Sequence, residues 1–338
     1  MKLVEYLRAQ GITNELLMTL VEYRNTNKAT DKELGIPAPH PRLTLPHTMY
    51  DGSSILLTAL SALLAGKHLL LVGDKGSGKN VLAETLALIL ARPLYEAPGH
   101  VYADAGALLG EKTLDAGSVR FESGPVTQGM EQGGIVVLDE VNMMRPECLA
   151  VLHSVTDKRN RVDVAGYKLV KAHPAFRVIG TMNIGYAGTQ ELNEAMVDRF
   201  VVLHVPAMTD KELHKFILSK YDGVDNDVAS YIVASYMDIR AKAVHGEITT
   251  KTVTIRGLLD ALDLVKMGME LHQALRVCIV NKSMEEHEQK VVQDIINTRI
   301  KPGMLAFRPP AVVVTGDEIK VDMGAKPTKS KRRVAVDA

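Results

Sequence analysis

One stretch of sequence decides the fold, and it reads His68-Leu-Leu-Leu-Val72-Gly73-Asp-Lys-Gly-Ser-Gly78-Lys79-Asn80. The apolar run predicts a short buried strand, the glycines predict a tight loop, and the spacing of apolar residues over 80–91 predicts a helix. Glycines let backbone N–H groups curl around an anion, and the start of a helix adds partial positive charge. Strand, loop, lysine and helix together match the GxxxxGK pattern of a phosphate-binding loop, in which the lysine reaches the β- and γ-phosphates of a nucleotide.

The position after the lysine departs from this pattern, because Asn80 stands where Ser or Thr is usual. A hydroxyl there normally binds Mg²⁺. The Asn amide oxygen is also a hard, neutral ligand, but it lies one bond further out, and Mg²⁺ demands near-octahedral geometry. We therefore expect nucleotide binding to survive better than turnover. The loop residues expected to bind the nucleotide are Gly73, Asp74, Lys75, Gly76, Ser77, Gly78, Lys79, Asn80 and Val81.

Outward from this loop, predicted strands and helices alternate along the chain. Such alternation predicts an α/β fold, with a parallel sheet and helices on both of its faces. The expected strands cover residues 68–72, 134–138, 176–181 and 201–205, and the expected helices cover 54–65, 80–91, 146–157 and a segment that ends at 195–200.

The alternation of strands and helices stops towards both ends of the chain, so the sequence predicts that the chain has four parts. Residues 1–47 read as two short helices and a linker marked by Pro37, Pro39, Pro41 and Pro46, since proline removes donors and disfavours helix before it. Residues 48–205 are expected to form the α/β core, 206–300 a nearly all-helical part, and 301–338 a small hairpin with a basic tail. The tail segment 326–333 has five basic residues in eight and no acid. It is expected to be a solvated tail, with a contact to nucleic acid or an acidic partner as the alternative.

Composition excludes several classes of protein. The chain has 338 residues, enough for about two domains, and its 40 Lys and Arg balance 40 Asp and Glu. A chain with zero net charge has no overall positive electrostatic field to attract phosphate groups, so we exclude a protein that coats nucleic acids non-specifically. Its two cysteines, Cys148 and Cys278, suit a reducing compartment. Because Glu5 interrupts the start and no clean apolar run is long enough to span a bilayer, we expect a cytoplasmic protein without a membrane segment.

A second motif carries carboxylates. Ile135-Val-Val-Leu-Asp139-Glu140 is an apolar strand that delivers two acids at its C-terminal end, where ligands of open α/β sheets bind. Asp139 is expected to hold Mg²⁺, and Glu140 to orient and deprotonate an attacking water. Alone, an apolar strand that ends in two acids is weak evidence for a nucleotide site. Here it lies sixty residues beyond Lys79, on a neighbouring predicted strand, and this context makes it convincing.

At this point the chain resembles the AAA+ ATPases, and within them the MoxR-like group that includes the CbbQ and NorQ activators. The resemblance covers about residues 48–265 and is carried by Lys79, Asp139-Glu140-Val-Asn142, Phe176-Arg-Val-Ile-Gly-Thr181-Met-Asn183 and Asp198-Arg199-Phe200, with Leu108-Leu-Gly110, Ser123-Gly-Pro125 and His173-Pro-Ala-Phe176 between them. It implies a P-loop NTPase sheet core with a C-terminal α-helical lid.

The resemblance also implies roles for four further side chains. Asn183 matches the polar sensor that helps Glu140 to place the lytic water. Arg199 matches an arginine finger that reaches the γ-phosphate of the neighbouring subunit. Arg256 matches the lid arginine that touches nucleotide in its own subunit, and Arg145 is a weaker candidate for a contact between subunits. Out of this context, Asn183 could cap a turn, Arg199 could form a surface ion pair and Arg256 could simply start a helix.

Residues 161–171 alternate like a hairpin that turns near Ala165-Gly166. In ring-forming relatives a hairpin here projects toward the pore, so Tyr167 and Lys168 are expected to touch a substrate. A merely structural hairpin fits the pattern equally well.

These features together predict an Mg²⁺–ATP-dependent ATPase that assembles into a homo-oligomeric ring, a hexamer, and remodels or activates a partner protein. From the resemblance, that partner is expected to carry a von Willebrand A-type domain. Two alternatives stay open: an AAA+ ring that acts on DNA through the segment 326–333, and a nucleotide-binding scaffold in which Asn80 impairs hydrolysis.

Overall fold

The computed structural model describes residues 3–27, 42, 46, 48–115, 118–183, 191–307, 311–315 and 318–322. Pro37, Pro39 and Pro41 of the predicted linker and the basic run 326–333 lie outside these residues. The chain divides into two compact units, Met1–Ala207 and Met208–Ala338.

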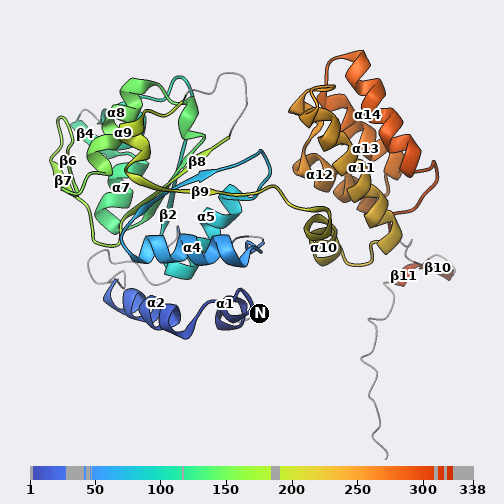
Figure 1. Ribbon diagram of the computed structural model, residues 1–338, viewed down its shortest axis with the longest axis horizontal. Coiled ribbons are helices and arrows are strands. Elements are labelled where there is room, and N and C mark those ends of the chain that lie inside the picture. The colour runs from blue at the N-terminus through green and yellow to red at the C-terminus, as the bar shows by residue number, and fades with distance from the viewer. Residues whose placement is uncertain are drawn as a thin grey trace, which may run out of the picture. The chain divides into compact units, whose positions relative to one another are not determined.

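A five-stranded parallel sheet runs through the first unit (Figure 1). Its strands are β1 (His68–Val72), β2 (Leu94–Pro98), β5 (Ile135–Asp139), β8 (Arg177–Met182) and β9 (Phe200–His204), in the order β2-β5-β8-β1-β9. The central strands are buried along nearly their whole length, as expected for parallel strands with both faces covered. The α/β fold predicted from the sequence is confirmed.

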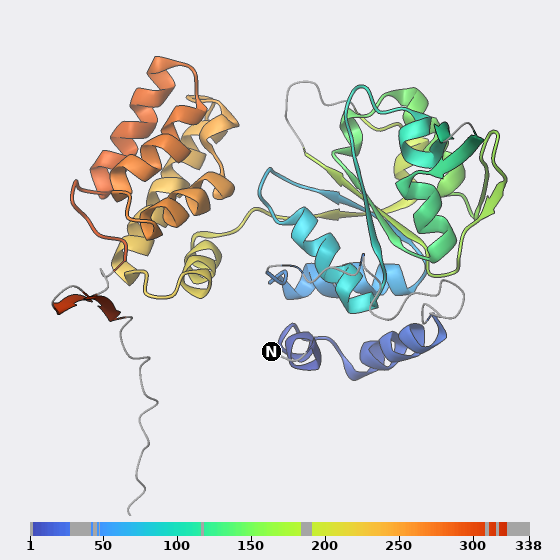
Figure 2. The same cartoon turned by 180° about the vertical axis from the view of Figure 1, so that it is seen from behind.

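Helices cover both faces of this sheet, and the view from behind shows the second face (Figure 2). Alternation along β1 divides its side chains: Leu70 and Val72 enter one apolar cluster, whereas Leu69 and Leu71 enter the other. The second cluster is completed by α1 (Leu3–Ala9), α2 (Asn14–Thr26), α4 (Ser53–Leu64) and α5 (Lys79–Leu90). The first cluster is completed by α6 (Ala105–Leu109), α7 (Pro125–Gln132), α8 (Pro146–Val155) and α9 (Glu194–Val197).

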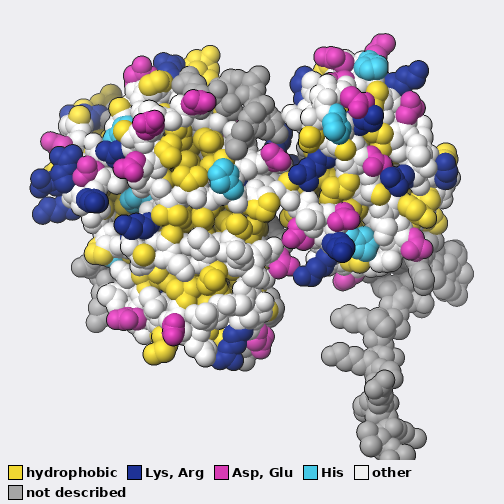
Figure 3. Space-filling view, viewed as in Figure 1, with side chains coloured by type: hydrophobic (Ala, Val, Ile, Leu, Met, Phe, Trp, Pro, Cys, Tyr) yellow, Lys and Arg dark blue, Asp and Glu magenta, His cyan; other side chains and the backbone are white. Residues whose placement is uncertain are grey.

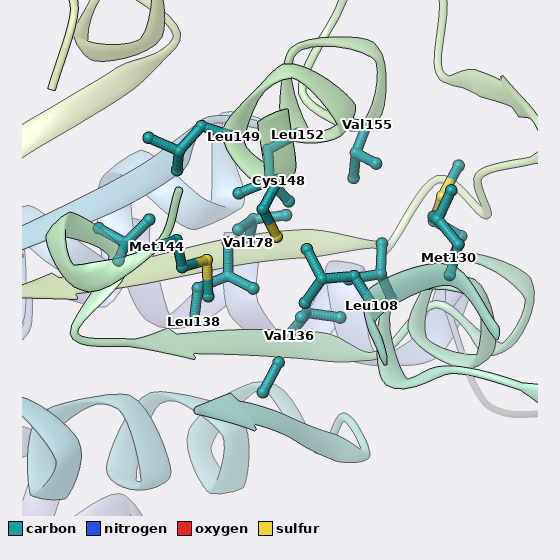
Figure 4. Close-up of a cluster of buried hydrophobic side chains, with 14 of the residues drawn as sticks. Leu108, Met130, Val136, Leu138, Met144, Cys148, Leu149, Leu152, Val155 and Val178 are labelled. Carbon is teal, nitrogen blue, oxygen red and sulfur yellow. The ribbon is translucent and has the colours of Figure 1, made fainter. Parts of the chain in front are cut away.

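The first cluster contains the thiol of Cys148, which lies among Val136, Leu138 and Leu152 (Figure 4). Burial raises the pKa of this thiol, so it stays protonated and packs as a small apolar group. Cys148 is therefore a core residue.

The structure adds three strands that the sequence analysis did not predict. β2 is an edge strand that contains Glu96 and ends at Pro98, so it lacks the continuous apolar run of the central strands. β3 (Gly110–Asp115) and β4 (Ser118–Ser123) form an antiparallel hairpin with mostly exposed side chains, which leaves no burial pattern to detect. The predicted hairpin at 161–171 is present as β6 (Arg161–Asp163) and β7 (Leu169–Lys171).

The second unit is helical over most of its length, as the sequence predicted. Its helices are α10 (Asp210–Lys220), α11 (Asn226–Val244), α12 (Ile255–Lys266), α13 (Leu271–Cys278) and α14 (Glu286–Arg299), with short 3₁₀ turns at Thr250–Thr252 and Val280–Lys282. The C-terminal hairpin is present as β10 (Ala311–Thr315) and β11 (Glu318–Asp322). Within the described ranges, no helix has the length and apolarity needed to cross a bilayer.

His68 begins β1 and ties it to the neighbouring strand. Its Nδ1 accepts the backbone N–H of Val178 at 3.0 Å, and its ring lies edge-on to Phe176 and Phe200. Burial, assisted by the charge of Arg177, lowers the pKa of His68 to about 4. The imidazole is therefore neutral in the folded protein at neutral pH.

We predict that His68 destabilises the fold in acid. Between pH 6.5 and about 4 the unfolded chain binds a proton that folded His68 excludes, so the free energy of unfolding falls as pH falls, by up to about 3 kcal/mol. His68→Asn keeps an acceptor for Val178 but does not titrate, so it should flatten this part of the pH profile in chemical denaturation. His204→Asn, at the exposed end of β9, serves as the control and should leave the slope as in the wild type.

Candidate active site

The candidate site lies at the carboxyl edge of the sheet. β8 pairs on one side with β5 and on the other with β1, so the ends of these three strands are adjacent. The phosphate-binding loop follows β1, Asp139 ends β5, and Asn183 follows β8. Parallel pairing thus brings together three segments that are far apart in sequence, at the edge where ligands of such sheets bind.

The loop after β1 presents the start of α5 to a ligand. Gly78 precedes the helix with φ of 89°, a left-handed conformation that glycine adopts without strain. No side chain caps the first turn of α5. Its backbone N–H groups are therefore available to an anion, as the GxxxxGK pattern predicted.

Lys79 is folded into the loop and makes four hydrogen bonds, the longest of them to Oγ of Ser77 at 3.5 Å. Its Nζ donates to the carbonyls of Gly73 at 2.9 Å and Asp74 at 2.8 Å, and to Oδ1 of Asn183 at 2.9 Å. Burial lowers the pKa of Lys79, although the carboxylates of Asp139, Asp74 and Glu140 act in the opposite direction. A phosphate that replaced these acceptors would give the buried ammonium an anionic partner.

Asp139 is held from two sides. Its Oδ1 accepts the hydroxyl of Thr181 at 2.5 Å, and its Oδ2 accepts Nδ2 of Asn80 at 3.2 Å. The residues predicted as metal ligands, Asp139 and Asn80, are therefore in contact. They offer a carboxylate and an amide oxygen, which suit Mg²⁺ together with phosphate oxygens and water. No cluster of three His, Cys, Asp or Glu that could hold a metal occurs in the described part of the chain.

Glu140 contacts Asn183, which also contacts Lys79. Asn183 donates from Nδ2 to Oε1 of Glu140 at 2.8 Å, while its Oδ1 accepts from Lys79. One amide thus bridges the loop lysine and the carboxylate predicted to act as base. The backbone of Glu140 is left-handed, with φ of 51° and ψ of 48°, and its N–H donates to Oγ1 of Thr181 at 3.0 Å.

Three supporting residues escaped the sequence analysis as site residues. The hydroxyl of Thr181 donates to the carboxylate of Asp139 and accepts the backbone N–H of Glu140. Asn142 donates to the carbonyl of Asn183 at 2.9 Å, and its own Oδ1 is buried without a partner. Gly99 donates to the carbonyl of Asp139 at 2.6 Å, and a Cβ there would lie 2.4 Å from the carbonyl of Glu140. Thr181 and Asn142 belong to the motifs that carry the family resemblance, and that membership could have identified them as site residues. No feature of the sequence indicates a role for Gly99.

Arg199 lies at the opposite edge of the sheet. It follows α9 and precedes Phe200, which pairs with His68 at the start of β1. The length of β1, roughly 16 Å at 3.3 Å per residue, separates that start from the phosphate-binding loop. The guanidinium donates to the carbonyl of Ala195. The pKa of His153 on α8 is lowered mainly by the burial of His153 and, to a smaller extent, by the charge of Arg199. The structure therefore does not bring Arg199 to the site of its own chain.

Two further arginines predicted as site residues, Arg256 and Arg145, have no observed contact with this cluster in the described part of the chain. Arg256 is exposed in the first turn of α12 in the second unit, where the Thr254 hydroxyl caps the helix by accepting from Gly257 N–H at 3.0 Å. Arg145 precedes α8, donates to the carbonyl of Val101, and lies over the ring of Tyr102. Both roles remain predictions.

Comparison with known proteins places the chain in a family. Residues 68–200 match the model of the AAA domain of the dynein-related subfamily, and residues 215–298 match the CbbQ/NirQ/NorQ C-terminal model. An uncharacterized protein of Staphylococcus aureus (strain NCTC 8325 / PS 47) is 33% identical over 260 residues, which cover 75% of this chain and 98% of that protein. YojN, an uncharacterized protein of Bacillus subtilis (strain 168), is 34% identical over 253 residues, covering 73% and 83%. A mutant of Thermotoga maritima RuvB has 18% identity and a TM-score of 0.45, covering 73% of this chain and 71% of its own.

The fold and the matches define a P-loop ATPase of the AAA+ class. The chain belongs to the MoxR-like group of this class, with the C-terminal domain of the CbbQ/NirQ/NorQ proteins. It is an ATP hydrolase by family and fold, and the resemblance seen in the sequence is confirmed.

We predict that Thr181→Val lowers ATP turnover by about 10- to 100-fold, because it leaves Asp139 and the N–H of Glu140 without their shared hydroxyl. Thr181→Ser keeps the hydroxyl and is the matched control, with turnover close to wild type. Steady-state phosphate release measures both. Equal turnover by the two variants would contradict a role for the hydroxyl.

Proposed function

We propose that the chain hydrolyses ATP with Mg²⁺ in a homo-oligomeric ring, a hexamer, and uses the energy to remodel or activate a partner protein. The observation that carries this proposal is the amide of Asn183, which joins Lys79 to Glu140. A nucleotide that draws Lys79 to its phosphates would break one side of this bridge. Binding and activation of the base are thereby coupled.

The protein side chains have separate roles in this mechanism. The N–H groups at the start of α5 and the ammonium of Lys79 would bind the β- and γ-phosphates. Glu140, oriented by Asn183, would accept a proton from the water that attacks the γ-phosphorus, with ADP and phosphate as products. Asp139 and Asn80 would hold Mg²⁺, whose chemistry when bound is to neutralise charge on the phosphate oxygens.

The position of Arg199 favours assembly as part of the active site. Because it lies at the amino edge of the sheet, it is available to a neighbouring copy rather than to its own phosphate-binding loop. A guanidinium supplied in this way to the γ-phosphate can raise turnover by about 10³–10⁵. In the second unit, Arg256 is proposed to touch the nucleotide of its own subunit.

The two small hairpins of the first unit are proposed as the contact for the partner protein. Tyr167 stacks on Phe121 of β4 with ring centroids 4.2 Å apart, so the two hairpins form one surface. Lys168 pairs with Glu131 of α7 at 2.7 Å. Leu114 and Val119 at the tip of β3 and β4 are exposed by 77% and 67%. Lys and Arg side chains gather along this edge of the unit (Figure 3). Such a surface suits a partner with apolar and acidic groups; a von Willebrand A-type domain is proposed from the family resemblance.

We predict that turnover per subunit rises with protein concentration and that Arg199→Ala and Glu140→Gln each abolish it. The sharper test mixes two inactive variants. Arg199→Ala keeps a complete nucleotide site, whereas Lys79→Ala keeps the arginine finger. A 1:1 mixture should recover roughly a quarter of wild-type turnover if interfaces form at random between copies.

Arg199→Lys is the control for charge alone and should stay impaired, because an ammonium cannot bind phosphate oxygens bidentately. Wild-type turnover by Arg199→Ala would contradict a role for Arg199. A silent mixture in which the two variants, carrying different affinity tags, co-purify as mixed rings would contradict catalysis across subunits.

We predict that Asn80→Thr raises kcat several-fold with little change in nucleotide affinity, since a hydroxyl lies one bond closer to the metal position than the amide oxygen. Asn80→Ala, which offers no oxygen, should lower kcat. If wild type and Asn80→Thr both bind ATP and neither hydrolyses it, the scaffold alternative replaces the ATPase proposal.

A further inference from the structure

The first N-terminal helix is hydrogen-bonded to the segment that precedes α4. The hydroxyl of Tyr6 on α1 donates to the backbone carbonyl of Tyr50 at 2.5 Å. Both residues are buried in the same apolar cluster, which also contains Leu82 and Leu86 of α5. A contact between positions 44 residues apart thus joins α1 to the surroundings of the phosphate-binding helix.

Tyr50 in turn contacts the phosphate-binding loop. A Cβ on Gly78 would lie 3.4 Å from Cε2 of Tyr50, so the ring lies beside this glycine at the start of α5 and would be in van der Waals contact with any side chain there. On its other side the ring covers Gly52, where a Cβ would lie 2.6 Å from Cε1. The N–H of Tyr50 donates to the buried hydroxyl of Thr85 on α5 at 3.0 Å. Tyr50 is therefore fixed to α5 by its backbone, and its ring lies beside Gly78.

Gln10, just after α1, holds the same segment at its other end. Its Nε2 donates to Oδ1 of Asp51 at 2.9 Å, and its Oε1 accepts the N–H of Gly52 at 3.3 Å and the hydroxyl of Ser53 at 3.2 Å. Gln10 is 8% exposed. The amide thus fixes the backbone between Tyr50 and the first turn of α4.

We propose that Tyr6 and Gln10 are positioning residues for ATP binding, which act by holding Tyr50 against Gly78. Glycine in a loop has more conformational freedom than any other residue, so binding an anion on its N–H groups costs the entropy of ordering it. An aromatic ring packed on Gly78 removes part of that freedom before the nucleotide arrives. This inference rests on the nucleotide site of the proposed function and assigns the N-terminal helix to that site.

A purely structural role predicts a different outcome. If α1 only completes the apolar cluster, removing the Tyr6 hydroxyl would lower the free energy of unfolding and leave nucleotide affinity unchanged. If α1 positions the loop, the same change weakens nucleotide binding. The chain offers a matched control, because Tyr23 on α2 also donates its hydroxyl to a backbone carbonyl, that of Ala175, at 3.3 Å.

The experiment compares Tyr6→Phe with Tyr23→Phe in the full chain. Each variant loses one hydroxyl and keeps its ring. The readouts are the dissociation constant of a fluorescent ADP analogue, KM and kcat for ATP, and the thermal midpoint. We expect Tyr6→Phe to raise the dissociation constant and KM about three- to tenfold, with kcat within about twofold of wild type. Tyr23→Phe should leave both binding parameters unchanged. Unchanged binding in Tyr6→Phe, or an equal rise in both variants, would overturn the proposal.

Two further variants complete the design. Gln10→Met keeps length and apolar volume but loses the amide, so it should also raise the dissociation constant; unchanged affinity would remove Gln10 from the proposal. Lys79→Ala separates the two proposals. If it binds the analogue as well as wild type does, the assigned nucleotide site is wrong and both proposals fall. If it loses binding while Tyr6→Phe binds like wild type, only the role of α1 falls.

Discussion

The parallel register of β5, β8 and β1 is the constraint on which the site depends. These strands end side by side, so the loop after β1, the acids after β5 and the amide after β8 meet without any help from the ligand. Both faces of the strands are covered by apolar clusters, which fix the register because a shift by one residue would turn every side chain to the wrong face. The geometry of the polar groups is thus set by the packing of apolar ones.

Within this frame, Asn183 gives the site a defined resting arrangement. Its amide satisfies Lys79 with the oxygen and Glu140 with the nitrogen, so neither charged group is left alone in a partly buried site. Thr181 does the same for Asp139 and for the N–H of Glu140. The structure shows this network closed on itself, and an anion that bound Lys79 would open one side of it. Through this one amide, the arrival of a phosphate at Lys79 would change the hydrogen bonding of Glu140, the proposed base.

Much of the fold and of this site could be predicted from the sequence, because central strands and the phosphate-binding loop are encoded locally. The run from His68 to Asn80 contains its own strand, loop and helix start, and the acids of β5 follow an unbroken apolar run. β2, β3 and β4 escaped because edge strands and exposed hairpins have no continuous burial pattern. The hydroxyl of Tyr6, the carbonyl of Tyr50 and the backbone at Gly78 meet only through tertiary packing, and no spacing rule indicates such a contact.

The left-handed backbone of Glu140 carries a consequence for the evolution and engineering of this chain. A residue with a Cβ in this conformation is strained by about 1–2 kcal/mol, and glycine or asparagine would relieve it. The fold alone would therefore be more robust without the carboxylate that the proposed chemistry requires. Selection for thermal stability would favour the replacement of glutamate at this position. Only selection for catalytic activity would retain it. Stability and activity are opposed at this one residue, so a hyperstable descendant of the chain with a changed position 140 would be a folded protein that has stopped turning over.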